Sequence, residues 1–89
     1  MSDTIYKEKI ISYDESEVLH KLIIFNSSHI WDDVIIQLQK GTGFDIIQCE
    51  QIAIIAHTKG KAVVCSGDIP KLNSVNSVLK EIQLVTEIE

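Results

Sequence analysis

The stretch QCEQIAIIAHTKGKAVV, residues 48–64, carries the most specific pattern in this sequence. Asp45 lies just before it, and with Gln48 three residues later it forms the signature of a helix start. Gly60 is expected to end this helix. Because its apolar residues cover more than one face, we expect neighbouring elements to enclose it. The run KAVVC, residues 61–65, then predicts a strand.

Two elements are predicted before this stretch. HKLIIF, residues 20–25, is short, β-branched and aromatic, which predicts a buried strand. Apolar positions in residues 30–38 recur at helical spacing, so we expect a first helix of about three turns that ends near Gly41. At least one side chain of Asn-Ser-Ser, residues 26–28, is expected to cap this helix, and Ser28 is the best placed.

The sequence after residue 65 predicts one more helix and one more strand. Asp68 can cap the helix, and Pro70 fits its first turn, where a missing amide hydrogen costs little. LVTEI, residues 84–88, alternates like a strand. The order β-α-α-β-α-β predicts an α+β two-layer domain, in which a three-stranded antiparallel sheet packs against three helices. We assign residues 19–89 to this domain and residues 1–18 to a flexible N-terminal arm.

Composition narrows the class of protein. A chain of 89 residues fits one domain, and the hydrophobic fraction of 45% is enough for a core. The net charge is -5 and no basic cluster occurs, which argues against nucleic acid as a partner. The N-terminal residues contain no apolar stretch of signal-peptide or membrane-helix length, so we expect a cytoplasmic protein without a membrane partner.

The reactive residue types do not form a pattern typical of an enzyme or a metal site. Cys49 and Cys65 stand alone in apolar segments, which favours buried thiols over a disulfide or a metal pair. The three histidines do not fall at zinc-site spacing, and no cofactor is expected. Ser27 and His57 could be imagined as nucleophile and base, but no strained elbow, oxyanion loop or third member is evident. We therefore expect a protein that is not an enzyme.

From residue 24 to the C-terminus, the sequence resembles the ClpS family of Clp protease adaptors, and it looks closest to the short forms of Bacteroidetes. A strand ends in Asn26 and two small polar residues, WDDVIIQL resembles the family's first helix, and the terminal EIE matches the short forms. The middle block is the most specific, because seven of its residues stand at the family's spacing. They are Gln48, Glu50, Gln51, Ala53, His57, Gly60 and Lys61.

The resemblance implies a function. Members of this family bind the N-terminal residue of substrate proteins, when it is large and hydrophobic, and deliver these proteins to a Clp unfoldase of the AAA+ class. Asn26 and His57 match two family residues that accept hydrogen bonds from the substrate's ammonium group. Ser27 stands where the family has an acid, so the motif is Asn-Ser-Ser. A hydroxyl accepts a hydrogen bond but brings no charge, so we expect weaker amine recognition.

The resemblance also implies an apolar pocket for the first side chain of the substrate. Trp31 matches the gatekeeping residue of the first helix, and Ala53 and Ala56 stand where larger residues are usual. The predicted pocket residues are Trp31, Val34, Ile35, Ala53, Ala56 and Leu84. The third helix, with which the family contacts its unfoldase, is rich here in Asn and Ser.

Other interpretations stay open at this point. His57 could be an ordinary histidine at a helix C-terminus, where the helix dipole favours it. Trp31 could be a core residue instead of a pocket wall. For the whole protein, the main alternative is a divergent protein-binding module that has the ClpS fold but has lost amine recognition. A hydrolase using Ser27 and His57 is a third hypothesis.

Overall fold

The computed structural model describes residues 19–89, and the arm predicted over residues 1–18 lies outside this range. The elements are β1 (His20–Phe25), α1 (Trp31–Thr42), α2 (Ile46–Lys59), β2 (Lys61–Gly67), α3 (Ile69–Leu79), the 3-10 turn η2 (Lys80–Ile82) and β3 (Thr86–Ile88). The predicted α+β class, with a three-stranded antiparallel sheet and three helices, is confirmed. No helix in the described part of the chain is long and apolar enough to cross a membrane.

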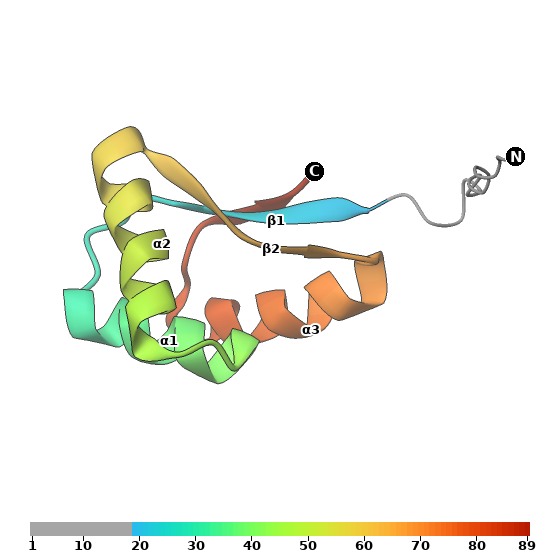
Figure 1. Cartoon of the computed structure of the whole chain (residues 1–89), viewed down its shortest axis with the longest axis horizontal. Helices are drawn as coiled ribbons and strands as arrows, with labels where there is room; N and C mark the ends of the chain where they lie inside the picture. The colour runs from blue at the N-terminus through green and yellow to red at the C-terminus, as the bar shows by residue number, and fades with distance from the viewer. Residues whose placement is uncertain (1–18) are drawn as a thin grey trace, which may run out of the picture.

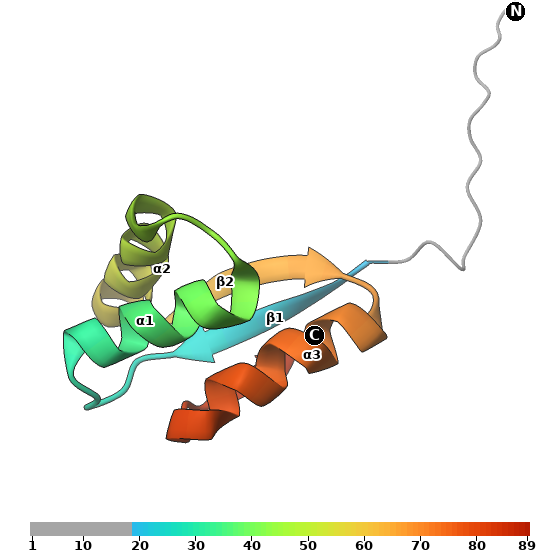
Figure 2. The same ribbon diagram turned by 90° about the horizontal axis from the view of Figure 1, so that it is seen from below.

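The sheet places β1 at its centre. The strand order is β2-β1-β3, and both neighbours run antiparallel to β1. Reciprocal backbone hydrogen bonds between Lys21 and Glu89, of 3.0 and 2.8 Å, attach the C-terminus to β1. In Figure 1, α1 and α3 lie beneath the sheet and α2 rises toward its left end. In Figure 2, the view from below, the helices lie in front of the strands.

The core lies between the sheet and the helices, and it follows from the alternation of the strands. Successive strand side chains point to opposite faces, so Leu22 and Ile24 of β1 face the helices. Ala62 and Val64 of β2 do the same. The helices contribute Ile35, Leu38, Cys49, Ile52, Ala53, Ala56, Leu72, Val75 and Leu79, and Leu84 completes the cluster.

The predicted enclosure of α2 is wrong. One stripe of α2, with Cys49 and Ile52 among its members, is buried. The opposite stripe faces solvent, because no other helix or strand within residues 19–89 packs against it. Its isoleucines, with their exposed fractions, are Ile46 (51%), Ile47 (64%), Ile54 (49%) and Ile55 (44%).

The ends of α2 and the start of α3 form as the sequence predicts. The Asp45 carboxylate accepts a 2.8 Å hydrogen bond from the Gln48 amide, which satisfies one free donor of the first turn. Asp68 accepts from the Lys71 amide at 3.0 Å in the same way. Gly60 ends α2 with φ of 92°, a left-handed conformation that glycine adopts without strain. Helix α2 is therefore fixed just before β2 begins.

The predicted side-chain cap of α1 is not formed. The N-cap residue is Ile30, and no side chain accepts a hydrogen bond there. Ser28 lies two residues too early, since the helix begins at Trp31. At the other end, α1 continues past the expected glycine to Thr42, and Gly43 takes the left-handed position with φ of 78°. The residues of the Asn-Ser-Ser motif are thus not engaged in capping this helix.

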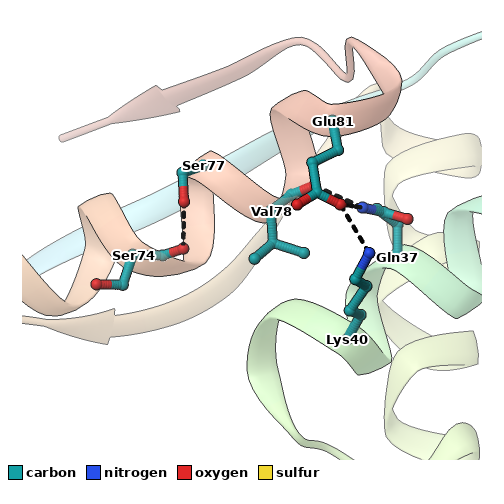
Figure 3. Close-up of polar contacts among 6 residues, drawn as sticks. All are labelled: Gln37, Lys40, Ser74, Ser77, Val78 and Glu81. Carbon is teal, nitrogen blue, oxygen red and sulfur yellow. Dashed lines mark hydrogen bonds and ion pairs between the residues drawn. The ribbon is translucent and has the colours of Figure 1, made fainter.

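A buried glutamine joins α1 to the end of α3. Gln37 is 6% exposed, and its Nε2 donates hydrogen bonds to the Val78 carbonyl at 2.6 Å and to Glu81 Oε1 at 2.9 Å. Lys40 Nζ donates to the same Glu81 oxygen at 2.8 Å (Figure 3). The hydrogen bonds from Lys40 and Gln37 lower the pKa of Glu81. Gln37 is therefore the buried member of a polar contact whose other side chains are exposed.

We expect Gln37→Ala to lower the free energy of unfolding by about 1–3 kcal/mol, because it removes the partner of a carbonyl at a buried contact. Lys40→Ala is the matched control: its ion pair with Glu81 lies in solvent, and such pairs contribute little. Urea unfolding of both variants measures the two effects. A larger loss of stability for Lys40→Ala would contradict the prediction that Gln37 contributes more to the free energy of unfolding than the ion pair does.

Candidate functional site

A cavity of about 190 Å³ lies where β1, α1 and α2 meet. The end of β1 and the segment after it form one side, the first turn of α1 another, and the second half of α2 the third. The residues that line the cavity are Ile24, Phe25, Asn26, Ser27, His29, Trp31, Val34, Ala53, Ala56 and His57. The cavity is thus mainly apolar, with four polar side chains from two segments of the chain.

The apolar residues that line the cavity differ in how much of their surface is exposed. Ala53 and Ala56 are 5% and 6% exposed, and their small side chains leave the space that forms the cavity. Trp31 is 41% exposed and therefore borders solvent. This exposure excludes the interpretation of Trp31 as a core residue. Val34, one turn further along α1, lines the same space.

Asn26 and His57 come from distant parts of the sequence but line the same cavity. The cause is the backbone: the Asn26 amide donates a 3.0 Å hydrogen bond to the Gly60 carbonyl, which ties the end of β1 to the junction of α2 and β2. His57 is in the last turn of α2, just before that junction. Both side chains are exposed, so the polar part of the cavity is open to water.

The segment between β1 and α1 has its own hydrogen bonds. Asn26 Oδ1 accepts from the Ser27 amide at 2.9 Å, and Ser27 Oγ accepts from the His29 amide at 3.4 Å. A hydroxyl oxygen has two lone pairs and an amide oxygen likewise, so each has capacity for a further donor. The polar part of the site can therefore accept hydrogen bonds from a ligand, next to an apolar space.

The cavity contains most of the residues predicted for the site, and two predicted wall residues lie elsewhere. Ile35 and Leu84 are 4% and 1% exposed and belong to the core. Ile35 directly follows Val34 on α1, and adjacent helical residues point in different directions, so only one of them faces the cavity. Whether Asn26, Ser27 and His57 bind a ligand stays a prediction.

The sequence did not single out three of the lining residues. Ile24 and Phe25 belong to a strand that was predicted only as a core element. His29 is one of the three histidines that lack zinc-site spacing, and it stands in a polar segment two residues before Trp31. Its Nε2 contacts the carbonyl of Ile82, in η2, and its Nδ1 is buried. A contact across 53 residues leaves no signal in local sequence.

The cysteines lie away from this cavity. Neither forms a disulfide; Cys49 is buried and Cys65 is partly buried. Burial raises the pKa of both thiols, which keeps them protonated and poorly nucleophilic at neutral pH. Within residues 19–89, no group of three or more His, Cys, Asp or Glu side chains could hold a metal ion.

Comparison with known proteins identifies the fold. No family model matches the sequence, and no curated protein matches it. Among solved structures, the chain is similar to Agrobacterium tumefaciens ClpS2 bound to L-phenylalaninamide. The TM-score is 0.70 and the sequence identity 18%, over 80% of this chain and 96% of that one. The chain therefore has a ClpS-like fold.

Proposed function

We propose that this protein is an adaptor that binds the N-terminal residue of substrate proteins and delivers them to a Clp unfoldase of the AAA+ class. One observation carries the proposal: Asn26, Ser27 and His57 line an apolar cavity large enough for one side chain. The ClpS-like fold supports it. In this proposal the binding unit is residues 19–89, and the protein acts in the cytoplasm.

The size of the cavity supports a single apolar side chain as its occupant. Cavities that hold drug-sized ligands measure about 300–1,000 Å³, whereas an apolar cavity of about 150 Å³ accommodates benzene. The value of about 190 Å³ is close to the second case. A phenylalanine or leucine side chain is therefore the expected occupant, and a whole small-molecule cofactor is not.

The polar rim supports an amine beside that side chain. An ammonium group has three donors, and Asn26, Ser27 and His57 can each provide an acceptor in water-accessible positions. L-phenylalaninamide, the molecule bound to the structural neighbour, combines an α-amine with a benzyl side chain. It is the natural first probe for this site. We propose no catalytic role for Ser27.

Ser27 is the observation that favours a second candidate, a divergent ClpS-fold module that has lost amine recognition. The hydroxyl carries no negative charge to balance an ammonium, although the exposure of the rim leaves that group partly hydrated. Such a module would use the same cavity for an apolar side chain of a partner protein.

Calorimetry with three small amides separates these candidates. We expect L-phenylalaninamide to bind, L-alaninamide to bind much more weakly because it leaves the cavity empty, and N-acetyl-L-phenylalaninamide to bind more weakly because it offers one donor instead of three. Equal binding of the acetylated and free amides would favour the divergent module. A second assay adds the protein to the Clp unfoldase and protease of its own organism, where faster degradation of a phenylalanine-initiated substrate is expected.

A further inference from the structure

We propose that His29 is a ligand-binding residue of this cavity, whose Nδ1 accepts a hydrogen bond from the N-terminal nitrogen of the ligand. This inference rests on the proposed function. It adds to the site an acceptor from the segment between β1 and α1, where Ser27 offers a hydroxyl without a charge.

The His29 side chain is held against the cavity from two directions. Its backbone amide donates to Ser27 Oγ at 3.4 Å, which holds the main chain of His29 next to Ser27. Ser27 is one of the residues that we assign to amine binding. Its ring Nε2 forms a short hydrogen bond with the carbonyl oxygen of Ile82. The ring therefore bridges the segment after β1 and η2, and His29 is one of the residues that line the cavity.

The contact with Ile82 decides which ring nitrogen of His29 carries the hydrogen when the ring is neutral. A carbonyl oxygen can only accept a hydrogen bond, so Nε2 must carry the hydrogen. In a neutral imidazole the other nitrogen, Nδ1, then has a lone pair and acts as an acceptor. The hydrogen bond to Ile82 thus fixes Nδ1 as the acceptor of the neutral ring.

This acceptor has no partner in the described protein. Among residues 19–89, His29 Nδ1 is the one buried side-chain nitrogen or oxygen without a hydrogen bond. Nearly all buried polar atoms in proteins are paired, because an unpaired one has lost its water without replacement. Because Nδ1 has almost no accessible surface, a donor in the cavity reaches it only once the ring turns about its hydrogen bond to Ile82, and that donor would then complete the pairing. An ammonium would then have His29 as a fourth candidate acceptor beside Asn26, Ser27 and His57.

The direct test is nitrogen NMR of the histidine rings during titration with L-phenylalaninamide. In the free protein we expect His29 to carry its hydrogen on Nε2, and we expect the Nδ1 resonance to move upfield as the amide saturates the site. His20 is the internal control, since it does not line the cavity. A His29 Nδ1 resonance that stays in place while binding saturates, or a hydrogen on Nδ1 in the free protein, would overturn the inference.

Two substitutions test the same role by affinity. His29→Phe keeps a ring but has no acceptor, and we expect it to weaken binding of L-phenylalaninamide roughly three- to tenfold, the effect of one neutral hydrogen bond. His29→Asn places an amide oxygen near the position of Nδ1 and should recover much of this loss. Urea unfolding shows whether losing the Ile82 contact affects folding, and the NMR titration decides the question if a variant does not fold.

The outcomes separate this inference from the proposed function. If the wild-type protein binds none of the amides, the proposed function fails and the inference with it. If the wild-type protein binds L-phenylalaninamide and folded His29→Phe binds it equally well, the inference fails alone. A loss in His29→Phe with recovery in His29→Asn supports both.

Discussion

Ser27→Asp is expected to bind L-phenylalaninamide about three- to tenfold more tightly than the wild-type protein, because a hydrogen bond to a charged acceptor contributes about 1 kcal/mol more than one to a neutral acceptor. Ser27 lines the polar side of the cavity, so a carboxylate there would lie beside the ligand's ammonium. The matched control is Ser27→Asn, which has nearly the same shape as aspartate but no charge. It should leave the affinity close to that of the wild type.

Fluorescence of Trp31 provides the measurement. It is the one tryptophan of the chain, and it lines the cavity at its solvent-exposed edge. The gain in Ser27→Asp should shrink as salt concentration rises, because the added interaction is between charges in a water-accessible position. It should also disappear for N-acetyl-L-phenylalaninamide, which has no ammonium. Equal gains in the aspartate and asparagine variants would show that charge is not the cause.

The sequence predicts the order of elements because each element has a local signal. Asp45 and Gly60 define α2 through capping chemistry that depends on a few adjacent residues. The alternation in HKLIIF, residues 20–25, needs only the strand itself. The prediction that α2 is enclosed was wrong for the opposite reason: whether Ile47 and Ile54 are covered depends on how distant elements pack, which local sequence does not show.

Some residues of the cavity could likewise be predicted from the sequence, and others could not. Asn26, Trp31, Ala53 and His57 were found through family spacing, which records residues that share a site even when they are far apart in the sequence. Residues that depend on side-chain direction were harder to assign. Leu84 was predicted as a pocket residue from the family resemblance, and it lies in the core.

The missed histidine has a different explanation. The contact of His29 with Ile82 requires the segment before α1 to lie against η2, which only the assembled fold shows. The absent cap of α1 has a related cause. Ser28 lies two residues before the N-cap residue Ile30, a shift in the helix start that the local sequence does not reveal.

Filling the cavity is the second change with a large expected effect. Ala53→Leu adds three carbon atoms at a wall residue that is 5% exposed, so the new side chain would occupy the space assigned to the ligand's side chain. We expect binding of L-phenylalaninamide to weaken about ten- to a hundredfold, because burial of such a side chain contributes roughly 1.5–3 kcal/mol. Calorimetry with the purified variant measures this loss.

The pattern across ligands makes this test specific. L-alaninamide does not reach into the cavity, so Ala53→Leu should leave its weak binding unchanged and thereby remove the preference for phenylalanine. Ile54→Leu is the control on the same helix, because Ile54 is 49% exposed and does not line the cavity. The free energy of unfolding of Ala53→Leu should not fall, since its added methyl groups enter existing empty space without displacing neighbours. A folded Ala53→Leu variant that still prefers phenylalaninamide would show that the ligand's side chain binds elsewhere.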